Sequence, residues 1–208
     1  QLQPLRNNND QFNQYIGNPN LKQSFSNSFN ISHNSYNFLK EFYSYQSINA
    51  SLTSNAITNN RIINPATGYT VTQPINTNGN LNVGFWSGMG VKLKKSGVRV
   101  NLGPNLNFSK FADVINSQTN YTKNLSAGIN LGAYKSKDKK YEISISNNFS
   151  YNRNTTSLNN STSNGNNKNY FSSNTLSAEA TVYYKKVWSI NTDYDFFYRQ
   201  KTTEFSND

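Results

Sequence analysis

Apolar and polar residues alternate with a period of two along most of the chain from about residue 80 onward, in six successive runs. The apolar positions of the first three runs are Leu81, Val83, Phe85, Met89, Val91 and Leu93; Val98, Val100, Leu102, Leu106 and Phe108; and Tyr121, Leu125, Ala127, Ile129 and Leu131. Those of the last three are Tyr141, Ile143, Ile145, Phe149 and Tyr151; Leu176, Ala178, Ala180, Val182 and Tyr184; and Trp188, Ile190, Tyr194, Phe196 and Tyr198. Successive side chains of a strand point to opposite faces, so this period predicts six strands with one apolar and one polar face each.

The first 80 residues carry a rougher version of the same pattern. The apolar positions of two further expected strands are Phe25, Phe29 and Ile31, then Tyr43, Tyr45, Ile48, Ala50 and Leu52. In the second strand these positions change from odd to even numbers after Tyr45, which predicts a β-bulge. A turn at 65–68, between Ile62 and Tyr69, predicts the tip of a hairpin whose second strand is weakened by Pro74.

The connections between these runs fall into two kinds. Short basic ones lie near 37–41, 94–97, 134–140 and 185–187, whereas longer or more polar ones are expected near 55–80, 111–120 and 153–170. Runs of about 12–15 residues are long for a soluble sheet, where strands of about 5–6 residues are usual. A tilted strand needs about 9–11 residues to cross a membrane. The pattern therefore favours a transmembrane meander with short turns on one side and longer loops on the other.

Aromatic residues gather at the two ends of the expected strands. Tyr141, Tyr184 and Trp188 lie beside the short turns. The residues expected at the opposite ends are Phe108, Phe111, Tyr121, Tyr151, Tyr170, Phe171 and Tyr198. Two aromatic girdles around an apolar band are typical of a lipid-facing barrel wall. We therefore predict an all-β, antiparallel transmembrane barrel rather than a soluble β-sandwich, whose aromatic residues would face a core.

Composition supports this prediction. Of 208 residues, 39 are Asn and 26 are Ser, and apolar residues reach only 34%, yet aromatic residues reach 14%. A disordered chain is usually poor in aromatic residues, and an enzyme core needs more aliphatic ones. No apolar run is long enough for a transmembrane helix, but alternating strands leave the mean hydropathy low.

The net charge of +10 comes largely from lysines in or beside the short turns. These are Lys40, Lys92, Lys94, Lys95, Lys135, Lys137, Lys139, Lys140, Lys185 and Lys186, half of the 20 basic residues. A nucleic-acid surface would need basic residues interleaved with stacking aromatic ones. We interpret the lysines as one solvated rim near lipid headgroups, and we expect no nucleic-acid partner.

The polar faces of the last two strands bring acidic residues together. If Tyr184 pairs with Trp188, Glu179 lies opposite Asp193 and Ser177 lies opposite Asp195. Opposed like charges are unfavourable. Arg199 is one residue that could compensate. The pair could form a lumen site for a cation or polar solute, and the alternative is a hydrated barrel wall.

Residues that usually carry catalysis or bind metal are scarce. Cysteine is absent and His33 is the only histidine, so a metal cluster of those types and a Ser-His-Asp triad are excluded. The glycines of 84–90 match neither a dinucleotide fingerprint nor a P-loop, and we expect them to thin the lumen wall or ease strand curvature. The Asp193 and Asp195 pair alone does not support acid–base chemistry. We expect no enzyme, catalytic residue, cofactor or metal, and we assign no substrate-contact residue.

Several segments resemble outer-membrane receptors. The sequence YIGNPNLKQS at 15–24 is similar to the GNPxLKPE segment of TonB-dependent receptors, although Gln23 and Ser24 replace its Pro and Glu. Further segments, at 50–57, 72–76, 103–108 and 147–152, resemble the related outer-membrane protein β-barrel family.

The resemblance implies a barrel of about 22 strands with an N-terminal plug. We expect residues 1–208 to be part of that barrel from a longer protein, with an extracellular lead-in at 1–24, about eight long antiparallel strands at 25–200, and no plug. The implied function is uptake of a bulky metal chelate, glycan or peptide through the outer membrane of a Gram-negative bacterium. The implied partners are outer-membrane lipid, the plug and a TonB-type energy-coupling protein. A porin or surface scaffold barrel, or a secreted Asn-rich adhesin, are the alternatives.

Overall fold

A computed structural model describes residues 6, 7, 10, 12–160, 163–185, 187–200 and 202. For residues 6, 7, 158–160 and 163–166 it describes the backbone only. Every regular element in these residues is a β-strand, and the twelve strands belong to one sheet. Their bounds are β1 Arg6–Asn7, β2 Asn13–Ile16, β3 Phe25–Asn37, β4 Phe42–Ser54, β5 Ala56–Ile63, β6 Thr70–Thr77, β7 Asn80–Lys92, β8 Arg99–Ile115, β9 Gln118–Lys137, β10 Tyr141–Asn160, β11 Ser163–Tyr184 and β12 Trp188–Arg199.

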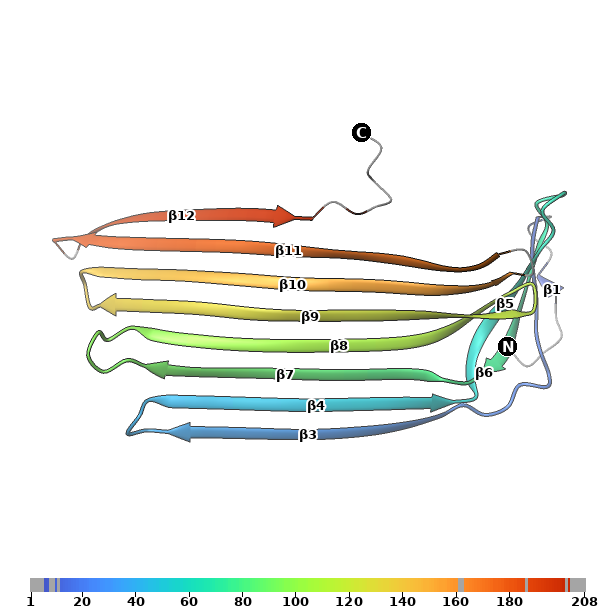
Figure 1. The fold of residues 1–208 in the computed structure, drawn as a ribbon, viewed down its shortest axis with the longest axis horizontal. Coiled ribbons are helices and arrows are strands. Elements are labelled where there is room, and N and C mark those ends of the chain that lie inside the picture. The colour runs from blue at the N-terminus through green and yellow to red at the C-terminus, as the bar shows by residue number, and fades with distance from the viewer. Residues whose placement is uncertain are drawn as a thin grey trace.

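Eight long strands form a single wall in the order β3, β4, β7, β8, β9, β10, β11, β12, and every neighbouring pair is antiparallel (Figure 1). They contain from 12 to 22 residues, long enough to cross a membrane at a tilt. In the described residues β3 and β12 each pair with one strand, so the wall is a partial barrel. This confirms the expected meander of about eight long strands, and its single layer does not fit a β-sandwich.

The register confirms the predicted faces of the wall. One row across the sheet joins Leu102 to Leu131, Leu131 to Asn147, Asn147 to Leu176 and Leu176 to Phe196. This apolar face is uncovered, since Leu131 is 46% exposed and Phe196 50% exposed. Among the described residues, the buried hydrophobic core consists only of Ala56, Ala112 and Val114. An apolar surface of this extent is stable when hydrocarbon covers it, as it does around a membrane barrel.

Strand β4 contains no bulge, so that prediction is wrong. It pairs without interruption with β3 and with β7. Tyr43 and Tyr45 instead lie on the polar face, opposite Gly90 and Gly88. The two rings occupy the space above these glycines, where a Cβ atom would meet ring atoms. The change in the apolar pattern therefore comes from aromatic residues packed over glycine.

The prediction of long loops at 111–120 and 153–170 is also wrong. Strand β8 continues to Ile115 and β9 starts at Gln118, so a two-residue turn joins them. Both turn residues, Asn116 and Ser117, have positive φ, as a type I′ hairpin requires. Likewise β10 extends to residue 160 and β11 begins at 163. The short turns at the other end lie close to where they were expected.

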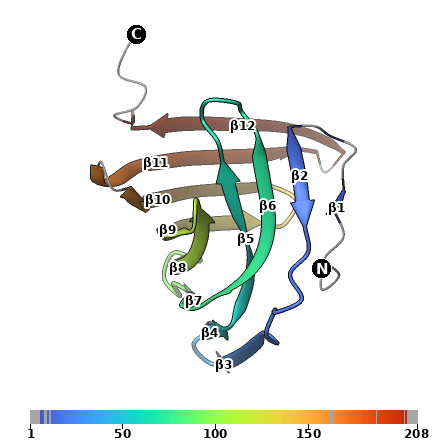
Figure 2. The same ribbon diagram turned by 90° about the vertical axis from the view of Figure 1, so that its right-hand side faces the viewer.

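The hairpin of β5 and β6 leaves the wall and runs across its open side at one end (Figure 2). Its tip at 64–69 confirms the predicted turn, in which the backbone N–H of Gly68 donates to Asn64 O. β5 pairs in parallel with the end of β8, and β2 pairs in parallel with β6. The prediction that the strands in 25–200 are antiparallel is therefore confirmed for the wall, but it is wrong for β5, which pairs in parallel with β8.

Before β2, the pKa of the exposed Asp10 carboxyl is lowered by hydrogen bonds from the Asn13 side chain and the Phe12 backbone.

Side chains fasten this hairpin to the β8–β9 turn. The Oδ1 of the buried Asn60 accepts from Ser117 N at 3.1 Å, and Asn116 Oδ1 accepts from Ile63 N at 2.8 Å. Arg61 forms an ion pair with Asp113 at 2.8 Å. Because an exposed ion pair contributes little, the buried amide is the stronger fastening.

Replacing Asn60 by Leu is therefore expected to loosen the hairpin. The substitution leaves Ser117 N without its acceptor, at a cost of about 1–3 kcal/mol. Hydrogen exchange of the backbone amides in 56–77 should become faster, while amides in the middle of β9 and β10 keep their protection. The control is Asp113→Asn, which should change exchange much less, and equal acceleration by both variants would contradict the assignment.

Two asparagines bond to each other on the apolar face. Asn147 of β10 donates to Asn174 Oδ1 of β11 at 2.7 Å, and Asn174 donates back at 3.4 Å. Their direct cross-strand neighbours include Leu131, Leu176 and Phe149. A polar group in hydrocarbon needs a partner, so each amide satisfies the other.

Asn147→Leu alone is expected to destabilise the barrel by about 1–3 kcal/mol, because it leaves the Asn174 amide unsatisfied. The double variant Asn147→Leu with Asn174→Leu should recover most of that loss. The measurement is the free energy of unfolding of the full-length protein in lipid vesicles. Additive losses in the double variant would show that the two amides act independently.

Candidate functional site on the polar face

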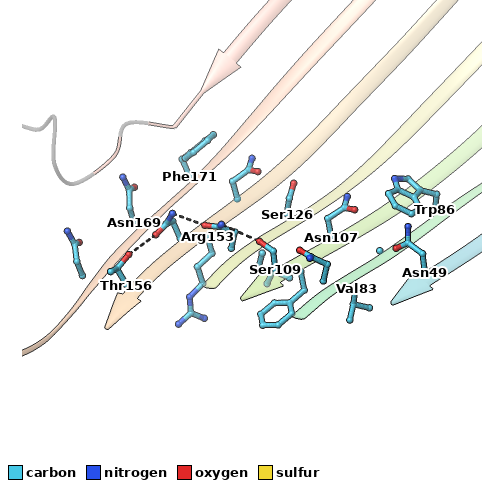
Figure 3. Close-up of a pocket in the computed structure, with 18 residues that line it drawn as sticks. Asn49, Val83, Trp86, Asn107, Ser109, Ser126, Arg153, Thr156, Asn169 and Phe171 are labelled. Atoms are coloured by element: carbon cyan, nitrogen blue, oxygen red, sulfur yellow. Dashed lines mark hydrogen bonds between the residues drawn. The ribbon is translucent and has the colours of Figure 1, made fainter. Parts of the chain in front are cut away.

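A hollow of about 790 Å³ lies along the wall in the half near the β5–β6 hairpin (Figure 3). Its polar lining is dominated by asparagines from six strands: Asn49, Asn82, Asn107, Asn124, Asn152, Asn154, Asn167 and Asn169. Arg153 is the one charged residue of the lining, and Figure 3 shows it on the other side of the sheet from Asn107 and Asn169. The polar face of the hollow is therefore uncharged and rich in both hydrogen-bond donors and acceptors.

Hydrogen bonds order part of this lining. Asn124 donates to Ser109 Oγ at 3.3 Å, Asn154 donates to Asn124 Oδ1 at 2.7 Å, and Thr156 donates to Asn154 Oδ1 at 3.4 Å (Figure 3). The chain of bonds crosses β8, β9 and β10. It fixes amide orientations in advance, which lowers the entropy cost of binding a polar solute.

Aromatic rings flank the asparagines. Trp86, 38% exposed, lies beside Asn49 at one end, and Phe171 lies beside Asn169 at the other (Figure 3). Phe171 pairs with Asn152, and Phe111 pairs with Thr122, so both aromatic residues belong to the polar face. The prediction that they belong to the lipid-facing girdle is wrong. In β8 and β11 the odd-numbered residues lie on the polar face, and Phe111 and Phe171 are among them. Rings beside amides suit a solute with both apolar and polar surface.

The predicted acidic pairing is confirmed. Tyr184 pairs with Trp188 and Glu179 pairs with Asp193. Ser177 Oγ donates to Asp195 Oδ1. Arg199 does not compensate these carboxylates in the described part of the chain, since its guanidinium lies 4.1 Å from the centroid of the Phe171 ring. This acidic strip lies outside the hollow and is exposed.

The rim at the short turns mixes both charges. Glu41 pairs with Lys92 at 3.1 Å and lies 3.9 Å from Arg99. Further along the rim, Tyr183 donates its hydroxyl proton to Glu142 Oε1 at 3.1 Å. The lysines at the short turns are not the only basic group of the wall, because a second one lies at its opposite end, on the apolar face.

The described residues include no group of three or more His, Asp or Glu side chains placed to hold a metal ion. They also include no helix that is long and apolar enough to cross a membrane. The polar face is thus a surface of amides, hydroxyls and rings, which can bind a solute through hydrogen bonds and stacking.

A wall with an exposed apolar face, aromatic ends and a polar inner face defines the class of outer-membrane β-barrels. Residues 1–118 match the outer membrane protein beta-barrel family, and the chain belongs to that family. No curated protein and no solved structure gives a significant match. The family places the protein in the outer membrane, where the apolar face contacts lipid and the polar face lines the barrel interior.

Proposed function

We propose that this chain forms part of the barrel of a TonB-dependent receptor that takes up a bulky polar solute. The observation that carries the proposal is the uncharged, asparagine-lined hollow on the polar face near the β5–β6 hairpin. Amides and hydroxyls bind hydroxyl-rich or peptide-like groups without requiring a particular charge. The solute classes that fit are a glycan, a peptide or a metal chelate with a polar exterior.

The proposal includes partners outside the described residues. A plug domain would close the barrel of about 22 strands, and a TonB-type coupling protein would supply energy. The protein would act as a transporter and not as an enzyme, in the outer membrane of a Gram-negative bacterium. The strand edges at β3 and β12 are where further wall strands would pair.

A porin or scaffold barrel is the second candidate, and the exposed acidic strip at Glu179 and Asp193 favours it. Acidic residues along a lumen are typical of cation-selective pores. The two candidates differ in energy dependence, because a porin conducts small solutes passively whereas a receptor needs the coupling protein.

The test uses the full-length protein in its native membrane. Recovery in the outer-membrane fraction, with gel mobility that changes on boiling, would establish a closed barrel. Growth of a deletion strain and a complemented strain is then compared on oligosaccharide, peptide or ferric chelate as the limiting nutrient. A defect on one nutrient that also appears when the coupling protein is removed supports the receptor, whereas energy-independent flux supports the porin.

Within this proposal, replacing Asn107 and Asn152 together by Leu is expected to lower uptake of the identified nutrient about tenfold. Two hydrogen-bonding amides are removed from the hollow, each contributing about 0.5–1.5 kcal/mol. The matched control is Asn148→Leu on the polar face of β10 outside the hollow. Uptake is measured with the labelled nutrient at equal amounts of protein in the membrane, and equal losses in both variants would contradict the site.

A further inference from the structure

Four basic side chains lie on the apolar face at the end of the wall opposite the short turns. Lys110, Lys123, Arg153 and Lys168 come from β8, β9, β10 and β11, one from each of four neighbouring strands. Lys110 lies opposite Lys123, Lys123 opposite Thr155, and Thr155 opposite Lys168, so three lysines share one row. Arg153 lies in the adjoining row. We call these four residues the outer basic belt.

The charge of the outer basic belt is not neutralised within the described part of the chain. None of its four residues forms an ion pair among the described residues. The three ion pairs found there join Arg61 to Asp113, Lys92 to Glu41 and Arg99 to Glu41. Directly opposed lysines such as Lys110 and Lys123 repel each other. Lys110 has one compensating contact, because its Nζ lies 4.3 Å from the centroid of the Tyr121 ring. An anion bound between the lysines would remove the repulsion.

The residues around the belt indicate at which depth of the membrane it lies. Its neighbours on the same face are aromatic and aliphatic, with Phe108 opposite Leu125 and Arg153 opposite Tyr170. Aromatic residues at the edge of an apolar band lie at the level of lipid headgroups. Arg153 lies on the other side of the sheet from Asn107 and Asn169, as Figure 3 shows, so the belt does not face a solute in the barrel interior.

We propose that the outer basic belt binds the phosphate groups of anionic lipids in the leaflet around this end of the barrel. Neighbouring strands are about 4.8 Å apart, so the belt extends over roughly 15 Å and can engage more than one phosphate. Arg153 can bind a phosphate through two N–H groups, and the lysines act as point charges. On the other rim Glu41 pairs with Lys92, whereas no residue of the belt has an acidic partner in the described part of the chain.

The test compares full-length protein in phosphatidylcholine vesicles with and without lipid A, a glycolipid with two phosphates. The belt variant combines Lys110→Gln, Lys123→Gln, Arg153→Gln and Lys168→Gln. The matched control removes four exposed lysines from the other rim, with Lys94→Gln, Lys95→Gln, Lys139→Gln and Lys140→Gln. The readouts are the shift in the thermal unfolding midpoint and the affinity for labelled lipid A. Single variants Lys123→Gln and Arg153→Gln serve if the belt variant does not fold.

Lipid A is expected to raise the unfolding midpoint of the native protein and of the control, but not of the belt variant. Each single variant should bind lipid A about fivefold more weakly. Dephosphorylated lipid A should have no effect on any of them. The proposal is overturned if belt and control variants respond alike, or if inorganic phosphate alone reproduces the midpoint shift, which would indicate a site for a soluble anion.

Discussion

Replacing Ile129 by Arg is expected to destabilise the barrel by about 2–4 kcal/mol, because it places a charge on the lipid-facing surface near the middle of the hydrocarbon layer. Ile129 lies at the centre of the apolar positions of β9, between Leu125 and Ala133, and pairs with Pro104 and Phe149. Its side chain is 36% exposed, with no second protein layer over it. Arginine there would have to reach a headgroup or carry water into the bilayer.

The neighbouring residue supplies the control. Asn130 follows Ile129 in the same strand but lies on the polar face, opposite Gly103 and Asn148. Asn130→Arg should change the free energy of unfolding by much less than Ile129→Arg. Both are measured by denaturant titration of the full-length protein in lipid vesicles, with the gel mobility of the folded form as a second readout. A larger loss for Asn130→Arg would mean that the two faces are assigned the wrong way round.

The alternation of residue types predicts the wall well, because it reports a local property of each strand. The pairing of Tyr184 with Trp188 follows from keeping two apolar faces in phase across a short turn, and the structure has that register. The same reasoning places Glu179 opposite Asp193 without any knowledge of the fold. Local periodicity and turn length are sufficient for this part of the sheet.

Composition predicts the strand ends poorly. Asn and Gly are depleted in strands, and Asn, Gly and Ser favour turns, which is why composition predicts a loop at 153–170. In the structure both sides of that hairpin pair residue by residue, with Asn154 opposite Asn169. Side chains reinforce the neighbouring ladder, since Ser157 Oγ accepts from Tyr121 N at 3.0 Å. Residue-by-residue pairing with a neighbouring strand outweighs the intrinsic preference of single residues.

Features that depend on distant segments could not be predicted from the sequence. The asparagines of the hollow come from separate strands, and nothing in the sequence distinguishes Asn107 from the other 38. The outer basic belt appears only when the registers of β8 to β11 are combined. The parallel contact of β5 with β8 likewise joins segments about 50 residues apart.

The packing of Tyr45 over Gly88 leads to the second large effect. Gly88 is buried, and a Cβ atom built there would overlap the Tyr45 ring. Gly88→Ala is therefore expected to displace the ring and destabilise the barrel by about 1–3 kcal/mol, which is the usual cost of overpacking. Alanine in a strand is otherwise preferred to glycine by about 0.5–1 kcal/mol, so a loss of stability is opposite in sign to the intrinsic effect.

A double-mutant cycle isolates this contact. In a Tyr45→Ala background the ring is absent, so Gly88→Ala should become neutral or slightly stabilising, and the difference between the two backgrounds is the coupling energy. Gly103→Ala is the matched control, since a Cβ atom there meets Ser87 O at 3.4 Å and Asn130 Cβ at 3.7 Å, both ordinary contacts. The free energy of unfolding in vesicles is measured for all variants. Equal effects of Gly88→Ala in both backgrounds would mean that the glycine is required for strand curvature rather than to accommodate the tyrosine, because only the second role depends on the ring.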